Sequence, residues 1–524
     1  MKQAHSVYLN FFSNVAELIF RHRLVLLSLL ILARYALEAT SGGRWAGDFW
    51  EHSAVVNEFM TRPLSPLHPQ LSVQASHAFL NPYGFSVAMV ALATKADAIS
   101  TLAAFGVLNF TILVVGLRQF IATVDESQAE GITFYTLLLA MFLWGKEAWQ
   151  FSGFYNIEIL NDVLPYPSTL ALGLTLYALA IFSKNLTLYA AAPSFLVVKR
   201  YFLVSLIAAV VLLIHPLTAL FLWIGLVCQL LAYQPTKLYA WLSLGLTVIF
   251  SIGLAVCWPY FSILQLMFGA GAAYHPSNAS MYLEIIQGTW PILLTLPLII
   301  WRATQRPNRS IALAMLALLA LYAWGYYSRQ YSFGRSIAFF LLLSNVLVAQ
   351  CLIEVERWPR PRVLSLIKAG TAAALCVAAG VWLYQSTSRL LTIANSLYLG
   401  RPIASQISYR DLIFLKNYVQ HDDVVLADID SSWKLPSLAG KAVATQHPLA
   451  FVPDWFIRKE EVIEFFSAKT TPQTRLAILK KYHPQYLLIK KSEQIPWQDI
   501  VAEFADGKQP VMSNDKFILL RLQH

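Results

Sequence analysis

A succession of long apolar segments dominates this sequence and constrains its fold more than any other feature. A helix that crosses a bilayer needs about 20 consecutive apolar residues. Hydrophobic residues make up 57% of the 524 residues and charged residues only 13%, with a mean hydropathy of +0.54. This composition excludes an ordinary soluble domain. We expect a polytopic α-helical membrane protein with about eleven spans, near 24–40, 97–117, 131–145, 167–183, 201–214, 217–233, 238–258, 286–301, 310–326, 335–353 and 364–384.

The charge pattern favours one orientation in the membrane. The formal net charge is +10, but the basic residues are spread in ones, twos and threes between apolar runs, which is typical of membrane orientation and not of nucleic-acid binding. The apolar segment Pro82–Thr94 is too short to span, so we expect an interfacial helix there. With the N-terminus cytoplasmic, the inner loops then collect most basic residues. The chain is therefore predicted to be a multi-pass protein of a bacterial inner membrane.

The composition changes after about residue 385. Residues 1–385 are predicted to form the membrane domain, and residues 386–524 a soluble domain on the outer, periplasmic side. Within this tail, strand-like stretches at Val424–Ala427 and Tyr486–Ile489 alternate with amphipathic helical patterns, the first of them at Arg410–Val419. The tail therefore predicts a small α/β domain.

The first outer loop carries the most reactive group of side chains, in residues 47–52. A helix that begins near Asp48 places Asp48, Glu51 and His52 on one face, because residues three and four apart are neighbours. Such a cluster can take a proton from a substrate hydroxyl. The alternative is a capping box, in which Asp48 caps the helix and Glu51 completes the pair. The residue pattern leaves both interpretations open.

Other outer loops add polar residues close to the hydrocarbon. Glu158 and Asp162 lie shortly before a span, where charged groups usually face a water-filled cavity, although a solvated loop also explains them. His215 and Pro216 form the whole connection between two spans, so a turn explains Pro216, and a satisfied histidine is the simpler interpretation of His215. His275 lies among aromatic residues that either stack on a sugar or anchor the interface.

Two arginines lie in a short outer loop rich in tyrosine. Arg335 enters an apolar span, where an arginine is costly unless it pairs with an anion. Arginine also binds phosphate in a bidentate manner, so the pattern favours a phosphate-binding role for Arg335 and makes Arg329 a second candidate. The alternative is that Arg335 extends towards a lipid headgroup.

Together these features resemble the GT-C superfamily of membrane glycosyltransferases, which use a polyprenyl-phosphate-linked sugar as donor. The resemblance is carried by Gly47-Asp48, the short apolar helix before the second span, the turn that starts at His215, Gly334-Arg335 and the outer α/β domain. It implies an inverting sugar transfer to a glycan, lipid or protein acceptor, with Asp48 as general base and Arg335 or Arg329 on the donor phosphate.

The predicted substrate-binding residues, taken from the outer loops, are Glu51, His52, Glu158, Asp162, His215, His275, Arg329 and Arg335. The first loop has Asp-Phe-Trp-Glu in place of Asp-x-Asp or an adjacent Asp-Glu pair. No metal ligand is therefore assigned, and a divalent cation stays open as a cofactor. The main alternative function is a transporter or a flippase of lipid-linked glycans, although no inverted repeat is evident in the sequence.

Overall fold

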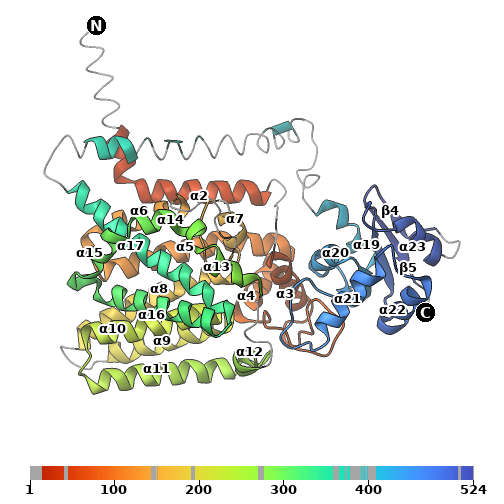
Figure 1. Cartoon of the computed structure of the whole chain (residues 1–524), viewed down its shortest axis with the longest axis horizontal. Helices are drawn as coiled ribbons and strands as arrows, with labels where there is room; N and C mark the ends of the chain where they lie inside the picture. Colours follow the sequence, from red (N-terminus) through yellow and green to blue (C-terminus); the bar gives the residue numbers. More distant parts are fainter. Residues whose placement is uncertain are drawn as a thin grey trace, which may run out of the picture. The chain divides into compact units, whose positions relative to one another are not determined.

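The computed structural model describes most of the chain and divides it into two units (Figure 1). Unit 1 comprises residues 1–40, 106–257 and 273–400, and unit 2 comprises residues 41–105, 258–272 and 401–524. The described residues are 15–40, 45, 47–142, 149, 151–157, 159–189, 195–269, 276–357, 365–371, 373, 376–377, 380, 391, 394–395, 398, 409–505 and 509–522.

All secondary-structure elements in the described part of unit 1 are helices or 3₁₀ turns. Its helices are α2 (Arg23–Thr40), α6 (Ala129–Phe142), α7 (Leu160–Val163), α8 (Pro167–Tyr189), α9 (Phe195–Ile214), α10 (Pro216–Tyr233), α11 (Leu238–Val256), α13 (Ser280–Leu283), α14 (Ile285–Leu294), α15 (Leu296–Ala303), α16 (Arg309–Tyr327) and α17 (Ser336–Glu356). Helix α5 (Ala98–Ala122) begins in unit 2 and continues into unit 1. Short 3₁₀ turns lie at Glu126–Gln128, Pro276–Ala279, Arg306–Asn308 and Tyr331–Arg335.

Small residues let two of these helices approach closely. A Cβ atom added at Gly116 of α5 would lie 2.1 Å from the carbonyl oxygen of Gly173 in α8, so only glycine fits at this crossing. Helices α8, α9, α10 and α11 also pack beside one another (Figure 1). The helices of unit 1 therefore bury their apolar faces against each other.

Six described helices are long and apolar enough to cross a membrane, or seven if the bent pair α14 and α15 is one span. These seven match the segments expected near 97–117, 167–183, 217–233, 238–258, 286–301, 310–326 and 335–353. The chain is a multi-pass membrane protein. The expected spans near 24–40, 131–145, 201–214 and 364–384 are not among these seven, so the expected count of eleven stays a prediction. Helix α2 carries Arg23, Arg34 and Glu38, α6 has only 14 residues, and much of 364–384 lies outside the described residues.

Unit 2 combines an α/β tail with the segments around α3 and α4. Its helices are α3 (Phe49–Thr61), α4 (Pro82–Thr94), α12 (Ile263–Phe268), α19 (Leu415–Tyr418), α20 (Ile429–Lys434), α21 (Trp455–Phe465), α22 (Pro472–Tyr482) and α23 (Trp497–Phe504), with 3₁₀ turns at Arg410–Leu412 and Leu435–Ser437. Helix α4 begins at Pro82 because the Asn81 side chain accepts a hydrogen bond from the backbone N–H of Gly84.

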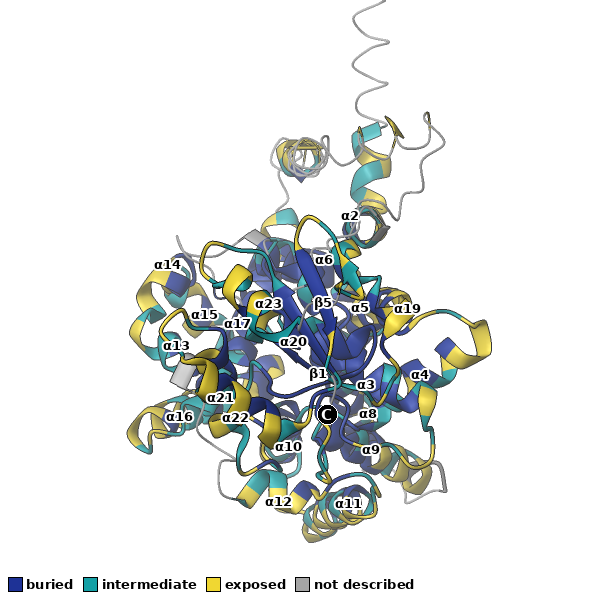
Figure 2. Ribbon diagram, turned by 90° about the vertical axis from the view of Figure 1, so that its right-hand side faces the viewer, coloured by how far each residue is buried: buried dark blue, intermediate teal, exposed yellow. Residues whose placement is uncertain are grey.

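The tail of unit 2 is built on one five-stranded sheet. Its strands are β1 (Val424–Ala427), β2 (Lys441–Ala442), β3 (Tyr486–Lys490), β4 (Met512–Ser513) and β5 (Phe517–Arg521), in the order β2-β1-β3-β5-β4. Strand β1 is parallel to β2 and β3, whereas β5 is antiparallel to β3 and β4. Figure 2 shows β1 and β5 as largely buried.

Residues of the first loop extend this sheet. Leu71 forms an isolated parallel bridge with Ala442 of β2, and the Ala442 N–H donates to the carbonyl oxygen of Gln70 at 2.7 Å. Leu71 and Ala442 also share a small apolar core with Leu449 and Val452. The segment between α3 and α4 is therefore an integral part of unit 2.

Candidate functional site

The carboxylate of Asp48 stands at the start of α3 without capping it. Asp48 precedes the first helical residue, but its side chain accepts no capping hydrogen bond from the helix. Gly47 before it has a positive φ of 60°, a conformation that glycine adopts without strain. The Asp48 side chain is 35% exposed. The structure therefore lacks the side-chain cap that was the alternative interpretation, and the carboxylate is available for other contacts.

His447, from the loop before α21, contacts both carboxylates of the first loop. Its Nδ1 atom lies 3.3 Å from Asp48 Oδ1 and 2.8 Å from Glu51 Oε1. The indole N–H of Trp433 donates to the same Glu51 oxygen at 3.1 Å. The Trp433 ring also packs edge-on against the imidazole, with ring centroids 4.9 Å apart. We call Asp48, Glu51, His447 and Trp433 the acid–imidazole cluster, and all four residues belong to unit 2.

Electrostatics keep a proton in this cluster. Burial raises the pKa of Glu51, and the charge of Asp48 adds to this effect, while His447 and Trp433 oppose it. Burial alone would lower the pKa of His447, but its hydrogen bond to Glu51 and the two negative charges raise it to about 9. At neutral pH His447 is therefore an imidazolium that holds Asp48 and Glu51 together.

His52 lies on the same helix but has a different environment. Its ring is buried and stacks on Phe79, with ring centroids 4.4 Å apart. Burial lowers the pKa of His52 to about 4, although the charge of Asp48 works in the opposite direction. His52 is therefore neutral at pH 7, and its predicted contact with substrate stays a prediction. The structure brings Asp48 and Glu51 together through His447. The His52 ring is instead packed in the core against Phe79.

A second ionic cluster lies at the other end of α3, around Glu58. This carboxylate is fully buried and lies 2.5 Å from Lys441 Nζ and 2.8 Å from His421 Nε2. Its other oxygen accepts from Arg62 at 3.1 Å and from the backbone N–H of Leu67 at 2.8 Å. Burial would raise the pKa of Glu58, but these donors and the charge of Lys441 lower it to about 2. We call Glu58, Lys441, His421 and Arg62 the buried salt-bridge cluster.

In unit 1, Arg335 ends the 3₁₀ turn that precedes α17. Its Nη1 donates to Ser152 Oγ at 2.8 Å and its Nε to Asn278 Oδ1 at 3.4 Å, and the guanidinium lies 5.6 Å from the ring centre of Phe151. Arg329 is exposed in the turn after α16, with a positive φ of 58°. The phosphate role of both arginines stays a prediction.

The other predicted residues of unit 1 fall into two groups. Asp162 lies in α7, where burial and the charge of Glu38 raise its pKa to about 7 while Arg34 opposes the shift. His215 caps α10, because its Nδ1 accepts from the backbone N–H of Thr218 at 3.3 Å. This contact agrees with the simpler interpretation of His215. Glu158 and His275 lie outside the described residues.

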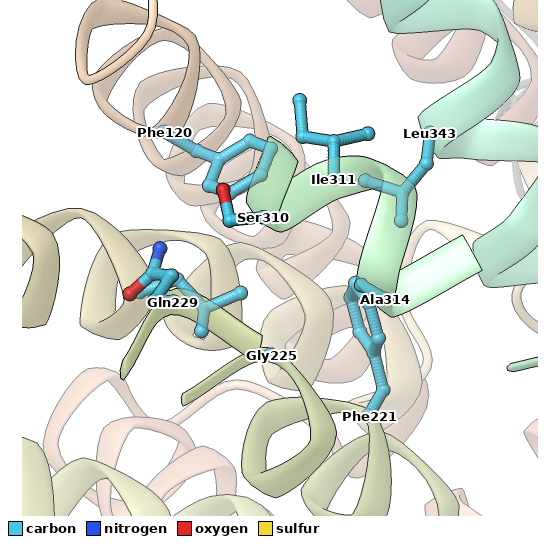
Figure 3. Close-up of a pocket in the computed structure, with 9 residues that line it drawn as sticks. Phe120, Phe221, Gly225, Gln229, Ser310, Ile311, Ala314 and Leu343 are labelled. Atoms are coloured by element: carbon cyan, nitrogen blue, oxygen red, sulfur yellow. The ribbon is translucent and has the colours of Figure 1, made fainter. Parts of the chain in front are cut away.

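Unit 1 also contains a narrow pocket between α5, α8, α10, α16 and α17 (Figure 3). Its lining is mostly apolar, with Phe120, Phe221 and Leu343 among the side chains, and Gln229 and Ser310 supply the polar groups. No charged side chain lines this pocket. Its lining therefore supplies no ionisable acid or base, and the acid–imidazole cluster is the better candidate for chemistry.

The sequence matches no family model and no curated protein sequence. Among solved structures, apo ArnT from Cupriavidus metallidurans aligns over 96% of this chain and 98% of ArnT, with a TM-score of 0.55 and 11% identity. The same protein bound to undecaprenyl phosphate aligns over 95% and 98%, with a TM-score of 0.56 and 12% identity. The chain has the GT-C fold. The apo oligosaccharyltransferase of Archaeoglobus fulgidus aligns over 88% of this chain and 69% of that one, with a TM-score of 0.47 and 11% identity.

The GT-C resemblance predicted from sequence is thus confirmed at the level of fold. Identities of 11% and 12% carry no residue roles, so the chemistry must be argued from the side chains themselves. In this chain, the acidic residue of the first loop, Asp48, belongs to the acid–imidazole cluster. Sequence reasoning found Asp48 and Glu51 but missed His447 and Trp433. A single histidine in a mixed tail gives no spacing signal, because its partners lie almost four hundred residues earlier.

The cluster also satisfies the first requirement of a metal site. Asp48, Glu51 and His447 each offer one ligand atom, and these atoms lie within 4.8 Å of one another. One imidazole nitrogen and two carboxylate oxygens form a donor set that binds divalent transition metals. A bound cation would replace the proton that His447 now shares with the carboxylates. Asp48, Glu51 and His447 therefore fit a divalent cation.

Proposed function

We propose that this chain is an inverting glycosyltransferase that moves a sugar from a polyprenyl-phosphate donor to an acceptor hydroxyl at the outer face of the membrane. The observation that carries the proposal is the Asp48 carboxylate, which caps no helix, is partly exposed and is positioned by His447. The GT-C fold supports the reaction class. In ArnT, undecaprenyl phosphate is the molecule bound in the matching structure.

In the proposed reaction Asp48 is the general base. His447 holds Asp48 Oδ1, and Oδ2 accepts the proton of the acceptor hydroxyl. The hydroxyl oxygen then forms a bond to the anomeric carbon while the bond from that carbon to the phosphate oxygen breaks. The electron pair of that bond leaves with the polyprenyl phosphate, and the configuration at the anomeric carbon inverts. Positive charge near the leaving phosphate would stabilise its developing negative charge.

Glu51 and Trp433 act on this base indirectly. The Glu51 carboxylate is buried and contacts His447 more closely than Asp48 does, so it fixes the imidazole in place. Trp433 in turn holds the Glu51 oxygen through its indole N–H. We therefore assign Glu51 a positioning role in addition to its predicted contact with substrate. Holding the general base close to its productive position can increase the rate of the chemical step by a large factor.

A divalent cation is the second candidate for this cluster. Asp48, Glu51 and His447 would hold it, and when bound it would supply positive charge next to the reacting groups. Metal removal tests this candidate. Treatment with a chelator should abolish transfer if the cation is required, and a divalent metal should restore it. If chelator-treated protein that is metal-free by elemental analysis transfers sugar at an undiminished rate, the cation is not required. The cluster with a protonated His447 is then the active form.

The central test is Asp48→Asn in proteoliposomes that contain a polyprenyl-phosphate sugar and an acceptor. General-base catalysis contributes about 10²- to 10⁴-fold, so kcat should fall by that factor. The variant should still insert and bind donor, because asparagine keeps the size of the side chain. Asp97→Asn, a change in another acid of unit 2 outside the cluster, is the matched control. Full turnover by Asp48→Asn would reject the assignment.

Arg335 is tested separately by donor binding. We expect Arg335→Ala to bind the polyprenyl-phosphate sugar more weakly, because a guanidinium can bind a phosphate in a bidentate manner. Affinity is measured by titration of purified protein, with Arg335→Lys to separate charge from bidentate geometry. Unchanged affinity of Arg335→Ala would contradict the phosphate role. If the protein moves the lipid-linked sugar across vesicles without forming a new glycosidic bond, the flippase alternative holds.

A further inference from the structure

The segment after α3 exposes two leucines in a loop stiffened by proline. The sequence from Pro63 to Leu67 reads Pro-Leu-Ser-Pro-Leu. Leu64 is 83% exposed and Leu67 is 42% exposed. Proline fixes the φ angle of its own backbone, so Pro63 and Pro66 restrict the conformations through which this loop could fold its leucines inward. Exposed apolar side chains that lie close to others can mark a surface that contacts a partner.

Hydrogen bonds at both ends hold this loop in place. The backbone N–H of Leu67 donates to Glu58 Oε1 at 2.8 Å, which ties one end to the buried salt-bridge cluster. At the other end, the Tyr260 hydroxyl donates to the carbonyl oxygen of Pro63 at 3.2 Å. The exposure of Leu64 is therefore a property of a fixed loop.

The second of these bonds joins the loop to another apolar segment, residues 258–272. This segment contains no charged residue. Its α12 exposes Leu264 (46%) and Phe268 (78%), and Figure 2 shows exposed residues on α12. The segment is fixed to unit 2, because the Trp258 indole N–H donates to the carbonyl oxygen of Leu80 at 2.7 Å. We call Leu64, Leu67, Leu264 and Phe268 the apolar rim.

Chain connectivity brings the apolar rim close to the bilayer. Helix α11, a candidate span, ends at Val256, only four residues before Tyr260. Four extended residues cover at most about 14 Å, and the headgroup layer extends about 5–8 Å beyond the hydrocarbon on each side. Tyr260, and with it the Pro63 carbonyl, therefore lies within reach of the headgroups.

We propose that the apolar rim inserts into the headgroup–acyl boundary of the leaflet on the side of unit 2. The composition of residues 258–272 favours lipid as the partner, because an uncharged apolar segment next to a membrane span suits this boundary. A protein-binding surface would instead be surrounded by polar residues. The contact would fix the end of α3 at a set height relative to the bilayer, since Glu58 holds Leu67. This inference is independent of the proposed sugar transfer.

Spin labels measure the contact directly. A variant in which Cys228, Cys257, Cys351 and Cys376 are replaced by serine or alanine receives one nitroxide through Leu64→Cys or Phe268→Cys. The protein is placed in vesicles of phosphatidylethanolamine and phosphatidylglycerol. The matched control is Leu476→Cys, an exposed leucine of α22. We expect the ratio of collisions with oxygen to collisions with a water-soluble nickel chelate to be severalfold higher at 64 and 268 than at 476.

Two outcomes would overturn the proposal. Equal ratios at all three positions would place the apolar rim in water, and labels at 64 and 268 that are shielded from both reagents would place it against protein. The unaltered chain provides a second measurement if the cysteine-free variant does not fold. Phospholipids with a photoactivatable acyl chain should then label the peptides that contain residues 63–67 and 258–269. Leu64→Asp with Leu67→Asp should lose the first adduct, and unchanged labelling would contradict the inference.

Discussion

The two ends of helix α3 carry glutamates whose pKa values are shifted in opposite directions. Glu51 and Glu58 are both buried and lie seven residues apart on the same helix. Glu51 accepts from His447 and Trp433, and burial raises its pKa. Glu58 accepts from Lys441, His421, Arg62 and the Leu67 N–H, and its pKa falls to about 2. Burial alone therefore does not set the charge of a carboxylate here, because the number and the charge of its donors decide.

This difference separates a structural role from a reactive one. In the buried salt-bridge cluster, the Glu58 carboxylate keeps its negative charge and is surrounded by Lys441, His421, Arg62 and the Leu67 N–H, which suits a fixed connection between α3 and the tail. The acid–imidazole cluster keeps a proton and partly exposes Asp48, which suits proton transfer. Each cluster can be changed without touching the other, so the comparison can be tested at both ends.

The largest expected effect is on stability, from Glu58→Gln. The change leaves the Lys441 ammonium buried without its anion, which should lower the free energy of unfolding by about 3–5 kcal/mol. Thermal unfolding in detergent measures it, with Glu51→Gln as the matched control at the other end, where we expect less than about 1.5 kcal/mol. Equal losses would contradict the assigned difference. Glu58→Leu combined with Lys441→Met should recover most of the stability, since neither charge is then buried alone.

The next effect is on activity, from His447→Gln. Glutamine can still donate one hydrogen bond, so the fold should persist, but the base loses the group that positions it. We expect kcat to fall by about 10²-fold with little change in KM. The same substitution at the other end, His421→Gln, should lower the thermal midpoint and leave kcat unchanged. A larger loss of kcat in His421→Gln would reverse the assignment of the two clusters.

The last expected effect is a pH dependence of stability with opposite signs. Between about pH 2 and 4.5 the unfolded chain binds a proton at Glu58 that the folded protein excludes, so this contribution is present above 4.5 and is lost as the pH falls through about 2. Between about pH 6.5 and 9 the folded protein keeps a proton on His447 that the unfolded chain releases, so that contribution is present below 6.5 and is lost as the pH rises through about 9.

Unfolding midpoints across this pH range give the measurement. Glu58→Gln should flatten the acid limb of the profile and His447→Gln the alkaline limb. If either variant flattens both limbs, the two clusters are coupled through α3 and the comparison fails. If neither variant changes its limb, other groups set the pH dependence.

The bounds of a helix or strand could be predicted from the sequence where neighbouring residues determine them. Helix α4 has the bounds expected, Pro82–Thr94, because Asn81 and Pro82 start it. Strand β1 matches Val424–Ala427, since an apolar run of β-branched residues favours a strand. The expected helix at Arg410–Val419 is instead a 3₁₀ turn and the short α19. An apolar pattern without a cap is consistent with either arrangement.

The partners within the candidate site could not be predicted in this way. Asp48 was found because acidic residues beside a span are unusual, and the resemblance to GT-C proteins gave it a role. His447, Trp433 and Lys441 lie in the tail, and no periodicity connects a single tail residue to α3. Such contacts depend on long-range packing, which local propensity does not encode. The same limit applies to His52, whose ring faces Phe79, a residue that belongs to the following loop.

The pairing of Glu58 with Lys441 also has a consequence for how the chain is made. The two residues are 383 positions apart, so the Glu58 carboxylate emerges from synthesis long before its ammonium partner exists. Until the tail arrives, α3 carries a carboxylate that has no place in an apolar environment, and the first loop has no imidazole to organise its acids. A nascent or truncated chain can therefore insert its spans while the cluster around Asp48 is still incomplete. Membrane insertion and maturation of the site are separate events, and the second waits for the last quarter of the polypeptide.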